Sequence, residues 1–390
     1  MKRITGATGL VALGVSVGAS NVYKIPIQNR AATPAGTNVA AIDWFYRGDN
    51  EWYSIVQVGS PPQNLTVAWD TGSVDLLLPG VNCTTCSNHT LFDPSKSSTY
   101  SPLPGRRTKA YYSTGVDSIP FTVPEGEGGI IVHDKIGLGD LVVDSQGFIL
   151  VDESAAALNK MPVDGILGLG APNVTGIGQI PWYWNLYDSG QLASPVFAFY
   201  TPAGDINGAE LTLGGIDDTK YEGEIPYTKL EDSRGGYTLR QGGLYINDKV
   251  FSKTGTAILD TGTAFMQTPD YQTAKKLYAA ISPNITQIDK AGAWGAPCEE
   301  IDAIAPEFTF TFGPVGGALN VTIPKEAFNL GEYPGQPGIC QALFNNPLEI
   351  VSLGGIWLIG SPLLKQYYTV WDGVNGEIGW GTLKAPASSK

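Results

Sequence analysis

Two aspartates in matching turns are the residues of this sequence best suited to carry out chemistry. Asp70 and Asp260 each follow a short hydrophobic run and begin an Asp-Thr-Gly sequence. The glycine lets the backbone approach closely, and the hydroxyl residue after it can donate a hydrogen bond to the carboxylate. These carboxylate-supporting residues are Gly72 and Ser73 in the first copy and Gly262 and Thr263 in the second.

Two carboxyls on facing turns would share one proton. At hydrogen-bonding distance both cannot ionise, so one acts as a base and the other as an acid. The ionised carboxylate can take a proton from a bound water while the protonated one donates to a peptide carbonyl, which predicts peptide hydrolysis without a covalent intermediate. A serine or cysteine nucleophile would need a histidine base, and the only histidines are His89 and His133.

A single Asp-Thr-Gly is an ordinary turn sequence, so the prediction depends on its repetition. Residues 67–73 correspond to residues 257–263, and each half continues with a second apolar run that ends in glycine, at Gly168 and Gly360. Short runs of Val, Ile, Leu, Thr and Tyr between Gly, Pro, Asn and Asp predict strands and hairpins. We therefore predict an all-β fold with few short helices, built as two pseudo-symmetric β-barrel-like lobes with the active-site cleft between them.

The length of 390 residues also favours two packed units, because it exceeds the size at which one hydrophobic core usually stops growing.

The N-terminus begins with basic residues followed by an uncharged run, which predicts a secretory signal. Helices are expected at residues 181–189 and 269–280. The predicted divisions are a signal peptide (1–20), a candidate short propeptide (21–43), an N-terminal lobe with Asp70 (44–222), a C-terminal lobe with Asp260 (223–386) and a tail (387–390).

The charge of the chain argues against several classes of partner. There are 37 Asp and Glu against 24 Lys and Arg, which gives a net charge of −13 and no basic field for nucleic acid. The carboxylates serve solubility or, alternatively, adaptation to acid. No later run is long enough to span a membrane, and two histidines with four cysteines are a poor basis for a metal site. We expect a monomer that acts on polypeptides, with no metal, cofactor or membrane partner.

From Trp52 to Leu383 the sequence resembles the pepsin-like aspartic peptidase family. Besides the two Asp-Thr-Gly turns, the matching segments are residues 60–63, 92–99, 164–170, 213–217, 357–360 and 366–372. The resemblance implies two β-rich lobes with a long cleft between them and catalytic roles for Asp70 and Asp260. It also implies that Gly168 and Gly360 support the two turns from behind. Proton sharing between two such carboxyls is the established behaviour of aspartic proteases.

Cysteines and sequons both fit a secreted protein. The cysteines fall into two close groupings, which favours disulfides Cys83–Cys86 and Cys298–Cys340, although four cysteines formally allow three connectivities. The family places disulfides at the same positions. We expect a secreted protein or, alternatively, one kept in an acidic vacuole or another secretory-pathway compartment. The candidate N-glycosylation sites are Asn64, Asn82, Asn88, Asn173, Asn284 and Asn320.

Three positions depart from the family pattern. The tyrosine that family members carry on a flap over the cleft is matched by spacing to Tyr112, but a rival alignment puts the flap tip at residues 123–128 and leaves no flap tyrosine. The tryptophan that usually bonds to this tyrosine is Leu77 here, and Ser361 stands where many acid-acting members have aspartate. The candidate propeptide is short, so strong control of a zymogen is not expected.

Two functions follow from these observations. The first is a secreted aspartic endopeptidase that cleaves extended polypeptides in acid, with a preference for apolar side chains beside the scissile bond. The second is a catalytically weak or inactive two-lobed binding or inhibitor protein with an altered flap. Because both carboxylate turns are intact, the first function is the prediction and the second is its alternative.

Overall fold

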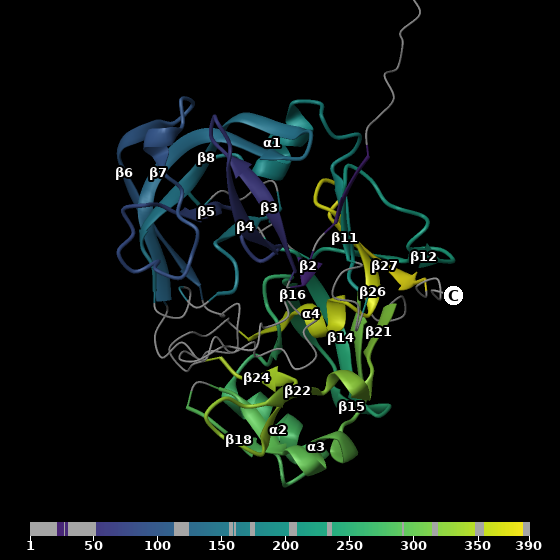
Figure 1. Ribbon diagram of the computed structural model, residues 1–390. Helices are drawn as coiled ribbons and strands as arrows, with labels where there is room; N and C mark the ends of the chain where they lie inside the picture. Colours follow the sequence, from purple (N-terminus) through teal and green to yellow (C-terminus); the bar gives the residue numbers. More distant parts are fainter. Residues whose placement is uncertain are drawn as a thin grey trace, which may run out of the picture.

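The computed structural model describes most of the chain from residue 52 onward, together with two short N-terminal strands. The described ranges are residues 22–26, 28–29, 52–112, 125–155, 159, 161–171, 176–202, 209–231, 236–290, 292–313, 319–347 and 355–384. The predicted signal peptide and C-terminal tail lie outside them. Within them β-strands are the main secondary structure, as predicted, and the strands form two lobes joined by a separate sheet (Figure 1).

The N-terminal lobe contains an eight-stranded sheet, and Asp70 is the last residue of its strand β4. Its strands come from the first half of the chain, and the ladder between β4 and β9 is parallel. In spatial order they are β2 (Gln28–Asn29), β3 (Trp52–Val58), β4 (Gln63–Asp70), β9 (Gly165–Gly168), β5 (Leu76–Pro79), β8 (Leu141–Glu153), β7 (Glu125–Leu138) and β6 (Ser101–Tyr112).

The C-terminal lobe repeats this plan around Asp260, with a parallel ladder between β16 and β25. Its main sheet is β21 (Leu319–Ile323), β20 (Phe308–Phe312), β14 (Thr238–Ile246), β16 (Gly255–Leu259), β25 (Ile356–Ile359), β17 (Met266–Gln267) and β24 (Phe344–Asn345), with β15 (Lys249–Ser252) paired to β14. A smaller sheet contains β18 (Thr286–Gln287), β19 (Trp294–Pro297), β23 (Ile339–Ala342) and β22 (Asn329–Glu332).

A seven-stranded sheet joins the lobes and draws strands from both halves of the chain (Figure 1). Part of the predicted propeptide forms its edge strand, because β1 pairs antiparallel with β11. The order is β1 (Tyr23–Pro26), β11 (Glu210–Leu213), β10 (Val196–Tyr200), β26 (Tyr367–Asp372), β27 (Glu377–Leu383) and β12 (Tyr221–Glu222), with β13 (Tyr227–Lys229) paired to β27.

Four short α-helices occur in the described part of the chain. The two predicted ones are confirmed as α1 (Trp182–Asp188) and α2 (Tyr271–Ile281). Helix α2 begins where its sequence predicts, since the Asp270 carboxylate accepts a hydrogen bond from the Thr273 amide at 2.7 Å. The other two, α3 (Cys298–Ile304) and α4 (Ser361–Leu364), are too short to produce a recognisable sequence pattern.

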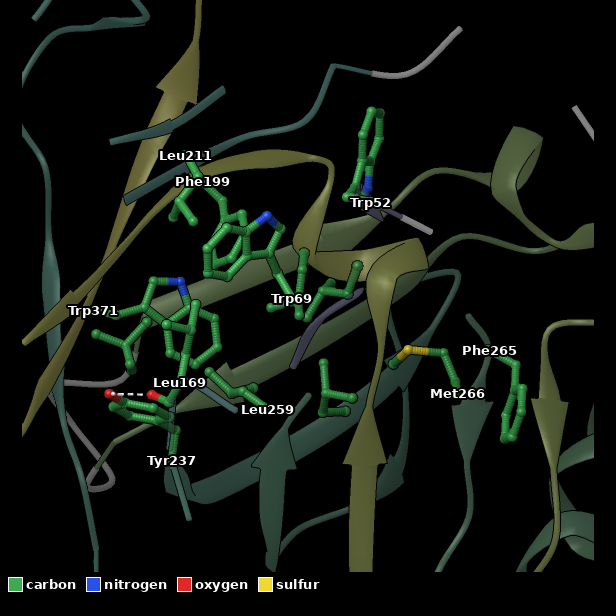
Figure 2. Packing of buried hydrophobic residues seen from close by; sticks show 14 of the residues in the cluster. Trp52, Trp69, Leu169, Phe199, Leu211, Tyr237, Leu259, Phe265, Met266 and Trp371 are labelled. Atoms are coloured by element: carbon green, nitrogen blue, oxygen red, sulfur yellow. Dashed lines mark hydrogen bonds between the residues drawn. The ribbon is translucent and has the colours of Figure 1, made fainter. Parts of the chain in front are cut away.

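A continuous aromatic core fixes one lobe against the other (Figure 2). Phe197 of β10 stacks on Trp371 of β26 with ring centroids 5.9 Å apart, and the edge of Tyr237 meets the same indole at 4.7 Å. The Tyr237 hydroxyl donates to the Leu169 carbonyl at 3.3 Å, which links the second half of the chain to the residue after β9. Rigid packing of this kind can hold two distant turns in a fixed relation.

Both predicted disulfides are confirmed, Cys83–Cys86 and Cys298–Cys340.

Most of the candidate glycosylation sites are on the surface, as carbohydrate attachment requires. Asn173 lies outside the described residues. The exposed asparagines are Asn64, Asn82, Asn88, Asn284 and Asn320.

Candidate functional site

Equivalent strands deliver the two aspartates to the same place. Asp70 is the last residue of β4, and Asp260 directly follows β16. Each is tied to the second apolar run of its own lobe: Leu169 donates its amide to the Asp70 carbonyl at 2.7 Å, and the Asp260 amide donates to the Ile359 carbonyl at 2.9 Å. Both turns therefore start from a buried parallel ladder.

Each carboxylate accepts the same pair of hydrogen bonds from its own turn. Asp70 accepts from the Gly72 amide at 2.8 Å and from the Ser73 hydroxyl at 2.5 Å. For Asp260 the donors are the Gly262 amide at 2.8 Å and the Thr263 hydroxyl at 2.7 Å. The four residues predicted to support the carboxylates thus all contact them, and the orientation of each carboxyl is fixed at both oxygens.

The two carboxyls face each other and lie within hydrogen-bonding reach. A methyl group added at Gly72 would lie 2.6 Å from the Asp260 carboxyl carbon, and one added at Gly262 would lie 2.7 Å from an Asp70 oxygen. Each glycine is therefore required by the opposite aspartate, since a side chain at either position would separate the pair.

A pair of threonines locks the turns together across the interface between the lobes. The Thr71 amide donates to the Thr261 hydroxyl at 3.1 Å, and the Thr261 amide donates to the Thr71 hydroxyl at 3.0 Å. The hydroxyls in turn donate to backbone carbonyls of the opposite strand, Thr261 to Trp69 at 2.8 Å and Thr71 to Leu259 at 3.3 Å. These buried bonds set the separation of the carboxyls.

The sequence interpretation missed this threonine brace. Thr71 and Thr261 were present in the motif, but only Gly and the residue after it were assigned a supporting role. Their matching positions in the two copies are the signal that could have identified them. A small polar residue that recurs between two functional residues in a duplicated chain is a candidate for contact across the pseudo-twofold axis.

Gly168 and Gly360 lie directly behind the turns. A methyl group at Gly168 would come within 2.6 Å of the Val74 backbone, and one at Gly360 would overlap the carbonyls of Thr263 and Phe265. Only glycine permits these approaches. The backbone packing that orients Asp70 and Asp260 thus depends on these two positions.

The electrostatic setting favours a shared proton. Burial raises the pKa of Asp70 well above its ordinary value near 3.8, and the neighbouring Asp260 carboxyl raises it further, while the bonds from Ser73 and Gly72 act in the opposite direction. Two neighbouring buried carboxyls resist ionising together. The arrangement therefore suits one protonated and one ionised carboxyl side by side.

The surroundings of the pair differ from the family pattern at the predicted positions. Tyr112 ends β6 and is paired with Glu125 of β7, at the base of a hairpin whose tip, residues 113–124, lies outside the described residues. Leu77 is buried beside the disulfide residues Cys83 and Cys86, so apolar packing fills its position. Ser361 is also buried and donates its hydroxyl to the Thr261 carbonyl at 3.3 Å.

The described residues hold no group of three or more His, Cys, Asp or Glu side chains that could bind a metal ion. No helix among them is long and apolar enough to cross a membrane.

Comparison with known proteins agrees with this geometry. The model of the eukaryotic aspartyl protease family matches residues 51–383. Cathepsin E of Mus musculus is 32% identical over 342 residues, which cover 85% of this chain and 80% of that protein. Pregnancy-associated glycoprotein of Equus caballus is 31% identical over 346 residues (86% and 81%), and pepsin A of Rhinolophus ferrumequinum is 30% identical over 337 residues (85% and 81%).

Proposed function

Because this chain belongs to the eukaryotic aspartyl protease family, we propose that it is an aspartic endopeptidase whose catalytic residues are Asp70 and Asp260. One observation carries the proposal: two buried carboxyls face each other at hydrogen-bonding reach, and each is oriented by two donors from its own turn. That arrangement is costly to build, since a charge is buried among few counter-charges, and a structural role does not require it.

The proposed reaction uses one water and one shared proton. The ionised carboxyl takes a proton from the water, whose oxygen attacks the peptide carbonyl carbon, while the protonated carboxyl donates to the carbonyl oxygen. The tetrahedral intermediate then collapses as a proton passes to the leaving nitrogen and the C–N bond breaks. Burial strengthens these transfers because competing solvent is excluded from both carboxyls.

The remaining predictions are part of the same proposal. We infer a secreted or vacuolar monomer that acts best in acid on extended polypeptides, with apolar side chains beside the scissile bond. Residues 1–20 would be removed as a signal and residues 21–43 would act as a short propeptide, followed by lobes at 44–222 and 223–386. Tyr112 remains the proposed flap residue, and the five exposed sequons and Asn173 remain the proposed carriers of carbohydrate.

Digestion of an acid-unfolded protein between about pH 2 and pH 7 tests the proposal. The wild type is expected to cleave it, whereas Asp70→Asn and Asp260→Asn should each lower the rate at least about 100-fold, because each removes one of the two proton-transfer groups. An Asn variant that cleaves at the parent rate would disprove the assignment.

The alternative is a two-lobed binding or inhibitor protein, and the absence of the family's tryptophan at Leu77 is the observation that favours it. The same digestion distinguishes the two functions. Wild-type protein that is folded but cleaves nothing across that pH range would favour the binding protein.

A further inference from the structure

A third carboxyl lies beside the Asp70 turn. Asp75 follows Asp70 by five residues, directly before strand β5, and its side chain is half-buried. Its backbone carbonyl accepts a hydrogen bond from the Gly168 amide at 3.0 Å. Because Gly168 packs behind the Asp70 turn, Asp75 belongs to the backbone framework that orients the proposed catalytic carboxyl.

The Asp75 carboxylate holds the loop that follows β9. Its Oδ1 accepts a hydrogen bond from the Ile177 amide at 3.3 Å, and the Gly176 amide bonds to the same carboxylate. A methyl group at Gly176 would overlap this carboxylate, so the close approach requires glycine. The side chain of Asp75 therefore joins the Asp70 turn to a residue 102 positions further along the chain.

Arg106 of β6 holds the same loop residue from its other side. Arg106 Nη2 donates to the Ile177 carbonyl at 3.3 Å. Asp75 thus binds the amide of Ile177 while Arg106 binds its carbonyl, and we call these three residues the clamp. Since β6 pairs with β7 to form a hairpin, the clamp connects the Asp70 turn to this hairpin through one residue.

The side chain of Ile177 extends the clamp into apolar packing. It is buried in a cluster with Leu77 of β5 and Ile131 of β7, and Ala110 of β6 packs against the same cluster. Protein interiors are densely packed, so a displacement of Ile177 is felt by its neighbours. Opening of the clamp would therefore disturb both strands of the hairpin and the strand that directly follows the Asp70 turn.

The second lobe has an apolar residue at the position of Asp75. Phe265 follows Asp260 by five residues, as Asp75 follows Asp70. Phe265 is buried in the main core cluster, and Figure 2 shows its side chain there. The repeated fold can thus be built without an ionisable group at this point, which indicates a role for Asp75 that is particular to the first lobe.

The charged and titratable groups around the clamp have bonds of their own. Arg106 bonds to the loop backbone, as described above. From β7, His133 bonds to a glutamine side chain of the same loop at 2.9 Å, and Glu127 accepts from a serine hydroxyl at 2.7 Å. Asp70 accepts from the donors of its own turn. Among the described residues, no charged group contributes to the pKa of Asp75.

The clamp is consequently firmer in acid. Burial raises the pKa of Asp75, while the two loop amides act in the opposite direction and do not cancel the rise. Such a carboxyl prefers its neutral form in the closed structure and its ionised form when it is exposed to water. The closed clamp is therefore favoured below about pH 4, and this advantage is lost as the pH rises through the raised pKa.

We propose that Asp75 is a positioning residue that closes the clamp in acid and releases it towards neutral pH, and that this release sets the alkaline limit of peptide cleavage. This inference rests on the proposed peptidase function. Release loosens the Asp70 turn and the β6–β7 hairpin together, so it lowers kcat more than it raises KM.

The pH profile of peptide cleavage tests the proposal, with the ratio of kcat at pH 6.5 to kcat at pH 3.5 as the measured quantity. Asp75→Asn stays neutral at both pH values and keeps an oxygen for the Ile177 amide, so it should raise this ratio at least about threefold. Arg106→Met weakens the clamp from the carbonyl side and should lower the ratio, because the clamp is already looser at pH 6.5. It also serves if Asp75→Asn does not fold.

Asp217→Asn and His133→Gln are the matched controls. Asp217 is a buried carboxyl of the sheet that joins the lobes, and His133 is the titratable side chain of β7 that bonds to the same loop. Neither substitution should change the ratio. An unchanged ratio in both Asp75→Asn and Arg106→Met, or an equal rise in either control, would overturn the inference.

Hydrogen exchange separates this inference from the proposed function. After correction for the intrinsic exchange rate, the Ile177 amide of the wild type should lose protection between pH 4 and pH 6.5, whereas in Asp75→Asn its protection should stay constant. Constant protection in the wild type would overturn the clamp. Wild-type protein that cleaves no peptide would instead overturn the proposed function.

Discussion

Replacing Thr261 with valine should destabilise the protein and impair catalysis together. Valine keeps the shape of threonine and removes only the hydroxyl, which donates to the Trp69 carbonyl at 2.8 Å and accepts from the Thr71 amide at 3.1 Å. Both partners belong to the backbone of the opposite turn, and the side chain is buried. The substitution therefore breaks two bonds between the lobes and leaves a buried amide without an acceptor.

The magnitude follows from these contacts. Loss of the bond to the Trp69 carbonyl should cost about 1 kcal/mol, and the Thr71 amide left without an acceptor about 1–3 kcal/mol, so the free energy of unfolding should fall by about 2–4 kcal/mol. A displacement of the turns by a fraction of an ångström should also lower kcat about 10- to 100-fold with little change in KM. Urea denaturation and steady-state kinetics on one peptide measure the two effects.

A second threonine pair provides the control. The hydroxyls of Thr309 and Thr322 lie 2.9 Å apart on β20 and β21, half-buried and away from the carboxyls, so Thr309→Val should cost at most about 1 kcal/mol and leave kcat unchanged. The brace would be refuted if Thr261→Val were no more damaging than this control. In the double variant Thr71→Val/Thr261→Val the losses should be smaller than additive, because both residues act in one network.

Three further predictions concern charge and cross-links. Burial alone would raise the pKa of Asp217, but its hydrogen bonds, first the one from Lys24, lower the pKa to about 2. The ionised Asp217 therefore stabilises the fold above about pH 4, and this contribution is lost as the pH falls to 2. Lys24→Met should accordingly lower the thermal midpoint at pH 6 and have no effect at pH 2. Burial raises the pKa of Asp75. Its contribution to stability is therefore present below about pH 4 and lost as the pH rises through its pKa in the folded protein. Asp75→Asn should accordingly raise the thermal midpoint at pH 6 but not at pH 3. Disulfide Cys298–Cys340 spans 42 residues, whereas Cys83–Cys86 spans three. Removal of the first should lower the free energy of unfolding, measured in urea, by about 4 kcal/mol and removal of the second by about 1.5 kcal/mol. Equal losses would contradict the view that a disulfide stabilises by restricting the unfolded chain.

The turns that hold Asp70 and Asp260 could be predicted from sequence because their geometry is local. A hydrophobic strand, an Asp-Thr-Gly turn and a hydroxyl residue lie within seven consecutive positions, and the structure uses them as the sequence indicates, down to the Ser73 and Thr263 hydrogen bonds. The all-β class and both longer helices follow from the same kind of short-range pattern.

The features that sequence reasoning missed depend on contacts between distant residues. The threonine brace joins Thr71 and Thr261 across the two lobes. Their matching positions in the two motifs mark them as candidates, but only the assembled lobes bring the two side chains into contact. The edge strand β1 is a second example: Lys24 was interpreted as part of a propeptide, but its pairing with β11 and its bond to Asp217 follow only from the assembled sheet. Such contacts are set by packing and not by local propensity.

The two lobes are alike at the carboxyls and differ further along the chain. The hydrogen bonds at the carboxyls are nearly identical in the two copies, since each carboxyl accepts one bond from a glycine amide and one from a hydroxyl of its own turn. The copies diverge seven residues further on, where Leu77 stands in the first lobe and Gln267 in the second. A peptide that crosses the pseudo-twofold axis has different side chains on its two sides, so a symmetric site could not distinguish its direction. Under the proposed peptidase function, the positions at which the two copies differ are therefore the ones expected to select the substrate.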